Sequence, residues 1–93
     1  MALSKTSTIG GTATDVVLDG KFNAIEVVNV NGGDVIWFRF DGTDATVAGD
    51  DCFVVPAVAG AYAIEVMNRT LTSTTVSIIT AGSSSVHVRG HTL

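Results

Sequence analysis

Cysteine, proline and charged residues are all scarce in this 93-residue chain, and each scarcity excludes a class of protein. A single cysteine, Cys52, rules out the intrachain disulfide framework that stabilises many small secreted domains. Charged residues make up 15% of the chain, against about 25% in an average globular domain. Two explanations stay open: Ser and Thr hydroxyls supply the polar surface, or partner proteins cover part of it. We therefore expect stability from packing or from oligomerisation.

Basic residues are scarce as well, since the chain has five Lys and Arg residues and a net charge of −4. They are scattered and form no run, so the sequence predicts no binding to nucleic acid. Residues 1–6 contain no apolar run of the kind found in signal peptides, so we expect no signal peptide. No apolar stretch approaches the length of a membrane span, so we expect no membrane partner.

What the chain does have is short β-rich runs separated by Gly, Asn and Asp, with no helical stripe of apolar residues. A spacing of roughly 8–12 residues between runs favours an all-β fold. We predict a single small β-sandwich of about seven short strands, with Greek-key or jelly-roll-like connections. The predicted strands span residues 12–18, 22–30, 35–41, 52–55, 61–67, 74–80 and 85–89.

The domain organisation follows from the same pattern. Residues 1–11 are rich in Ser, Thr and Gly and lack a clear period, so we predict a flexible N-terminal arm there. Residues 12–93 form the single β-sandwich domain. Asp19-Gly20 and Asp41-Gly42 are turn dipeptides. The segments Asn31-Gly32-Gly33 and 81–84 are predicted to close β-hairpins.

Alternation along each predicted strand assigns one apolar face to the core. In residues 35–41, one face carries Ile36, Phe38 and Phe40, and the other carries Trp37 and Arg39. The same alternation in the other strands completes the predicted core, which consists of Val16, Leu18, Ile25, Val27, Ile36, Phe38, Phe40, Tyr62, Ile64, Val66, Val76, Ile78, Val86 and Val88.

The sequence contains no motif for catalysis or for a cofactor. The acidic loop 41–51 has four carboxylates, but their spacing does not match a calcium-binding loop. Turn formation and solvation explain these residues, although a cation remains an open alternative. His87 and His91 would lie about 13 Å apart on a strand, too far to share one zinc ion without a bend. Cys52 has no sequence-local catalytic partner. We predict no enzymatic activity, no catalytic residue, no cofactor and no metal.

Trp37 and Arg39 are the candidate interface residues, because both types are enriched where proteins meet. The alternative for Trp37 is that it covers a second layer of its own fold.

Residues 33–56, GDVIWFRFDGTDATVAGDDCFVVP, carry a resemblance to a known family. A strand ending in Asp-Gly leads through a Thr/Val/Gly loop to a short strand that ends in Val-Val-Pro. This pattern, with FNAIEVVN at residues 22–29 before it, resembles small β-rich virion proteins of tailed bacteriophages. The similarity covers residues 22–66, about half of the chain.

The resemblance implies a structural role in the virion, most often as a decoration (cement) protein that binds and stabilises the exterior of the phage head. The implied partners are the major capsid protein and further copies of the chain, with a homotrimer expected because such proteins often sit at three-fold positions. The implied location is the capsid surface. Alternatives are a tail or connector component, or a β module that binds a host surface or a glycan.

Overall fold

The computed structural model describes the backbone of residues 4–92 and the side chains of residues 4–66 and 74–92. The described chain is all-β, as predicted. It contains no helix long and apolar enough to cross a membrane. Six strands follow one another in the order β1 (Ser4–Ile9), β2 (Thr14–Asn29), β3 (Ile36–Arg39), β4 (Phe53–Val55), β5 (Ala61–Thr80) and β6 (Ser84–His91).

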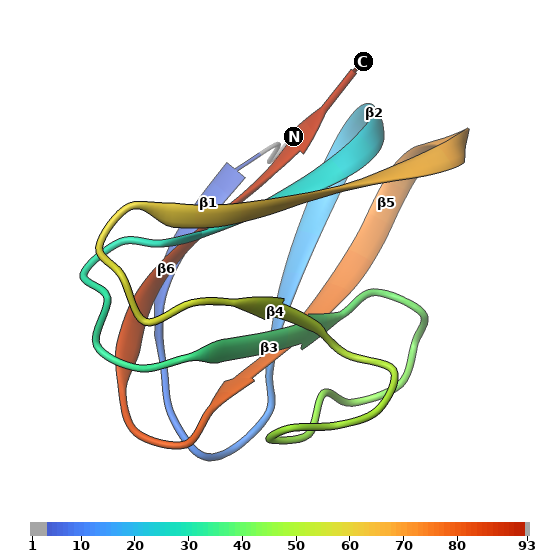
Figure 1. The fold of residues 1–93 in the computed structure, drawn as a ribbon. Coiled ribbons are helices and arrows are strands. Elements are labelled where there is room, and N and C mark those ends of the chain that lie inside the picture. Colours follow the sequence, from blue (N-terminus) through green and yellow to red (C-terminus); the bar gives the residue numbers. More distant parts are fainter. Residues whose placement is uncertain (1–3, 93) are drawn as a thin grey trace.

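Backbone hydrogen bonds join these strands into one antiparallel sheet in the order β1-β6-β2-β5-β3-β4. The sheet is strongly curled, like half of a barrel, and encloses the core on its concave side (Figure 1). The division into two separate sheets, which a sandwich requires, stays a prediction.

The curl comes from β2 and β5, the two longest strands. Each takes the place of two predicted short strands, so the structure has six strands, two of them long, where about seven short ones are predicted. In β2 the register shifts between Asp19 and Phe22, and Gly20 has a φ of 126°, a region that glycine enters without steric cost. The predicted Asp19-Gly20 turn is thus a bulge that bends a continuous strand. Both long strands change direction at the upper end of the molecule (Figure 1).

This bend lets the two long strands serve both halves of the sheet. The first part of β2 pairs with the last part of β5, from Thr14–Ile78 to Asp19–Ser73. Beyond the bulge, β2 pairs with the start of β5 on one side and with β6 on the other. The end of β5 pairs in turn with β3. The β2–β5 pair is therefore the frame to which the other strands attach.

Both predicted hairpins are wrong. The turn at Asn31-Gly32-Gly33 exists, and Gly32 has a φ of 65°, but β2 and β3 are not neighbours in the sheet. Likewise, residues 81–84 connect β5 to β6, which are also not neighbours. Each turn carries the chain from one half of the curled sheet to the other. The next strand cannot pair with the one just completed, because β2 already lies between β6 and β5, and β5 lies between β2 and β3. Turn residues predict a reversal of direction but not the pairing partner.

The predicted N-terminal arm also differs from the structure. Ser4–Ile9 forms the edge strand β1, which pairs with β6 from Ser4–Arg89 to Ile9–Ser84. Ile9 is buried in the core. A Ser/Thr-rich stretch gives little apolar signal, but backbone pairing to an existing strand does not require one. Residues 1–3 of the predicted arm lie outside the described range.

The core cluster contains ten of the fourteen predicted residues, and Phe40 packs against it from a partly buried position. Phe38 and Ile36 on β3 are fully buried, as the alternation predicted. Phe22 and Val55 join the core, although the predicted list omits them.

The three remaining predicted core residues lie outside. Tyr62, Ile64 and Val66 are exposed, at 61%, 39% and 63%. The face assignment for this part of β5 is therefore wrong, and register explains why. Ala63 pairs with the buried Val27, and directly opposed side chains point to the same face of a sheet. Ala61 and Ala63 thus face the core, and the larger side chains point outward.

Asn29, at the end of β2, is a fully buried polar residue with every group of its side-chain amide engaged. Its Nδ2 donates to the carbonyls of Asp34 and Pro56, at 2.8 and 3.0 Å. Its Oδ1 accepts from the Gly32 amide and, at 2.6 Å, from the Ser84 hydroxyl. One buried amide thereby ties together three loops at one end of the sheet.

Truncating Phe38 to Ala tests the core assignment. We expect the free energy of unfolding to fall by about 3–5 kcal/mol, because a fully buried aromatic ring is removed. The matched control is Tyr62→Ala, whose ring is exposed and should cost less than about 1 kcal/mol. Urea unfolding of both variants measures the difference. Equal losses would show that the faces of β3 or β5 are misassigned.

Asn29→Asp tests the buried amide. The substitution replaces two donors with a carboxylate that faces two carbonyl oxygens, so we expect a loss of at least about 3 kcal/mol. Asn31→Asp is the control, since Asn31 Oδ1 accepts from Gly33 N, Ser84 Oγ and Ser85 N, and a carboxylate does the same. Thermal unfolding followed by circular dichroism compares the two. Similar melting temperatures would contradict the role of the amide.

Candidate interaction surface

The candidate interface residues Trp37 and Arg39 lie together on the outer face of β3, opposite the core. Trp37 is half-buried and pairs with Val54 of β4, which is 53% exposed, and with the buried Ile79 of β5. The Arg39 side chain is 17% exposed. The structure thus brings the two residues onto one face with an exposed apolar neighbour. Part of the indole is already covered by the protein's own fold.

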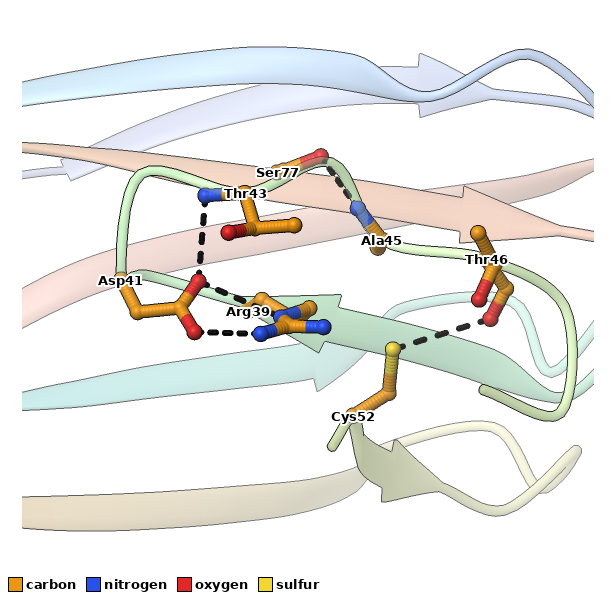
Figure 2. A network of polar contacts seen from close by, with 7 residues as sticks. All are labelled: Arg39, Asp41, Thr43, Ala45, Thr46, Cys52 and Ser77. Atoms are coloured by element: carbon orange, nitrogen blue, oxygen red, sulfur yellow. Dashed lines mark hydrogen bonds and ion pairs between the residues drawn. The ribbon is translucent and has the colours of Figure 1, made fainter. Parts of the chain in front are cut away.

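Arg39 is committed to the loop that follows it (Figure 2). Its guanidinium forms an ion pair with Asp41, whose Oδ1 also accepts from Arg39 Nε at 3.2 Å and from the Thr43 amide at 3.1 Å. Arg39 therefore lowers the pKa of the Asp41 carboxyl, and the Thr43 amide lowers it further. The same bond raises the pKa of Arg39. The first residues of the acidic loop 41–51 are fixed by this pair.

The rest of the loop is also held by specific contacts. The Ala45 amide donates to the Ser77 hydroxyl of β5 at 2.9 Å, and Ala45 is buried against the sheet. The carbonyl of Thr46 accepts from the Gly49 amide and from the Cys52 thiol. Cys52 is half-buried and acts as a structural donor here. The loop is therefore a built element of the fold, and it presents the exposed side chains of Val47 and three aspartates, Asp44, Asp50 and Asp51.

A hollow of about 260 Å³ lies where this loop crosses the outer face of β2 and β5. The carboxylates of Asp15 and Asp44 and the hydroxyls of Thr43, Thr75 and Ser77 line it, together with Gly42. The described residues contain no group of three or more His, Cys, Asp or Glu side chains able to hold a metal ion. The hollow is polar and hydroxyl-rich.

The two histidines and Arg89 share the outer face of β6. His87 Nδ1 lies 2.7 Å from the hydroxyl of Thr6 on the edge strand. Both Arg89 Nε and His91 Nε2 lie 3.0 Å from Glu26 Oε1. Glu26 is 13% exposed, whereas Arg89 is 46% exposed. The histidines bind separate partners, so the structure does not bring them together.

An exposed apolar stripe lies next to these charged residues. Tyr62, Ile64 and Val66 alternate along β5 and so point to the same outer face, at a repeat of about 7 Å. Ile64, Glu26 and Arg89 stand in one row across β5, β2 and β6. Sequence reasoning placed the stripe in the core and missed it. The alanines at positions 61 and 63 were the only available signal, because small residues suit a strand that packs closely against the core.

Comparison with known proteins gives a fold and no function. No protein-family model and no curated protein matches the sequence. Among solved structures, the crystal structure of PirA is similar to this chain. The match covers 98% of this chain and 95% of the PirA chain, with a TM-score of 0.52 and 14% sequence identity. At that identity the likeness shows a shared all-β fold alone.

The Arg39–Asp41 ion pair should make the stability of the acidic loop depend on pH. The ordinary pKa of the Asp41 carboxyl is 3.8, and its pKa in the folded protein is lower. The pair therefore stabilises the loop fully above about pH 4 and loses that effect as the pH falls through the lowered pKa. An NMR titration of Asp41 should show a midpoint below 3.8 that rises toward this value in Arg39→Gln. Arg89→Gln is the control and should leave it unchanged. An Asp41 midpoint insensitive to Arg39→Gln would contradict the assignment.

Proposed function

We propose that this chain is a non-enzymatic structural protein of a tailed-phage virion, and specifically a decoration protein that binds the major capsid protein on the outer surface of the head and stabilises the shell. The sequence resemblance supplies the virion context. The physical support is the amount of apolar surface that the folded chain leaves in contact with water.

The observation that carries the proposal is a set of nine large apolar side chains that stay exposed among the described residues. Exposed apolar residues are ordinary when scattered, but here several are contiguous. Val54 adjoins Trp37 on the β3–β4 face, and the β5 stripe lies on the other half of the curled sheet. Two separate apolar areas suit a protein that contacts both a shell and its own neighbouring copies.

A repeated arrangement makes such small contacts effective. A symmetric shell presents the same site many times, and each bound copy links adjacent capsid subunits. Contacts that are weak individually then raise the cost of separating those subunits together. We assign the shell contact to the face of Trp37, Arg39 and Val54, and the contacts between copies, with a homotrimer as the favoured state, to the β5 stripe.

The finer details of the fold belong to the same proposal. One half of the curled sheet contains β1, β6, the end of β2 and the start of β5. The other half contains the start of β2, the end of β5, β3 and β4. We propose that these halves act as the two layers of a jelly-roll-like sandwich around the common core.

One observation favours a second candidate function. Tyr62 is an aromatic residue with 61% of its surface exposed, and glycan-binding modules use exposed aromatic rings to stack on sugars. Specific binding of the isolated chain to a glycan array, abolished by Tyr62→Ala, would favour this candidate over the decoration protein.

The test of the decoration proposal uses phage shells that lack this protein. Purified chain is added, shell occupancy is measured by electron microscopy, and the temperature of genome release is measured by fluorescence. We expect regular occupancy of the head and a higher release temperature.

Val54→Asp should reduce occupancy at least ten-fold at limiting concentration, because it places a charge in the apolar contact. Val30→Asp is the matched control: Val30 is 47% exposed and lies outside the proposed contact. Binding to the tail alone would support the tail or connector alternative. Occupancy of the head without a change in release temperature would contradict stabilisation.

A further inference from the structure

Charge is segregated in the fold. The acidic loop 41–51 contains four aspartates, and Asp15 lies at the hollow beside it. Among the described residues, the basic side chain that contacts this loop is that of Arg39, which is already paired with Asp41. Asp44, Asp50 and Asp51 are exposed, and none of them forms an ion pair within the described part of the chain. The loop therefore presents uncompensated negative charge around the exposed Val47, which is 44% exposed.

The complementary surface is the outer face of β5, β2 and β6, which we call the stripe face. It carries the apolar residues Tyr62, Ile64 and Val66, with Arg89 two strands away from Ile64 in the same row. Arg89 uses its Nε for Glu26. Its terminal amino groups make no ion pair with another described residue, and the side chain is 46% exposed. A guanidinium has five N–H donors, so its exposed end can bind a second carboxylate beside Glu26.

Each of the two surfaces places an apolar side chain near a charged one. Two strand separations place Ile64 and Arg89 about 10 Å apart. On the loop, Val47 and Asp50 are three residues apart, within turns closed by the hydrogen bonds from Gly49 N to Thr46 O and from Cys52 N to Gly49 O. The loop thus offers an apolar side chain and a carboxylate, and the stripe face offers an apolar side chain and a guanidinium.

The two surfaces also lie in different parts of the molecule. In Figure 1 the loop between β3 and β4 is at the lower right, whereas the end of β6 and the bends of β2 and β5 are at the top. A loop in one copy therefore cannot reach the stripe face of the same copy without unfolding. A second copy can present its loop there.

From this complementarity we propose that copies of the chain associate head to tail, with the acidic loop 41–51 of one copy docked on the stripe face of the next. Val47 packs on Ile64 and its neighbours, and Asp50 or Asp51 binds Arg89. The contact is heterologous, since two different surfaces meet, and it closes into a ring when the rotation between copies divides a full turn. The hydrogen bonds that hold the loop in place lower the entropy lost on docking. The inference rests on the proposed self-association and specifies its contact.

Charge exchange in the isolated chain tests it. The dissociation constant for self-association is measured by sedimentation at pH 7.5. We expect Arg89→Glu, and separately the double variant Asp50→Lys/Asp51→Lys, each to raise that constant at least ten-fold. An equimolar mixture of the two should associate again. In the mixture, the native loop of the Arg89→Glu variant meets the native stripe face of the double variant. The positively charged loop of the double variant meets the stripe face that carries Glu at position 89.

Two controls keep the test decisive. Lys5→Glu makes the same charge change, but Lys5 pairs with Val88 and so lies on the opposite face of the sheet, and association should be unaffected. Arg89→Gln replaces Arg89→Glu if repulsion from Glu26 unfolds the latter, as judged by circular dichroism. It should also weaken association.

The outcomes separate this inference from the proposed function. A wild-type chain that stays monomeric at the highest concentration would overturn the head-to-tail contact. So would association that ignores Arg89 and the loop, although it would leave self-association itself intact. Failure to bind shells, with charge-exchange rescue observed, would overturn the decoration proposal and leave the contact standing.

Discussion

The antiparallel pairing of β2 with β5 is the constraint on which the rest of the molecule depends. These two strands contain 16 and 20 residues, and their pairing continues past the bulge at Asp19–Phe22. Because each strand bends, one pair borders both halves of the sheet. β6 attaches to β2 and β3 attaches to β5, while β1 and β4 pair outside them. The core then fills the concave side of a single curled sheet.

Register within this pair decides what the protein shows to its surroundings. Val27 is buried, so the residue opposite it, Ala63, faces inward and Tyr62 and Ile64 face outward. A shift of one residue would bury the aromatic ring and expose the alanines. The larger side chains of this part of β5 are therefore the exposed ones. Its place in the sheet imposes that arrangement, since side-chain size alone would favour the reverse.

Polar contacts hold the loops in place around the β2–β5 pair. Asn29 joins three loops at one end, where every donor and acceptor of its amide is satisfied. Near the other end of β3, Arg39, Asp41 and Ser77 fix the acidic loop against β5. These contacts use few charges, which agrees with the low charge content of the chain. Most of the described carboxylates are thereby left on the surface.

The sequence by itself determined the all-β class, the position of most strands and the buried faces of β3, the end of β5 and β6. These features are local: alternation of apolar residues assigns a face wherever one set of residues is clearly more polar. It also singled out Trp37 and Arg39, which the structure places together on the outside of β3.

Only the tertiary structure decided the pairing partners, the merging of short runs into two long bent strands, the pairing of β1 and the outward face of Tyr62, Ile64 and Val66. Each of these depends on which strand lies alongside, and hydrogen bonding between distant segments leaves no periodic trace in either segment alone. Where both faces of a strand are apolar, as at the start of β5, the register with the neighbouring strand determines which face is buried.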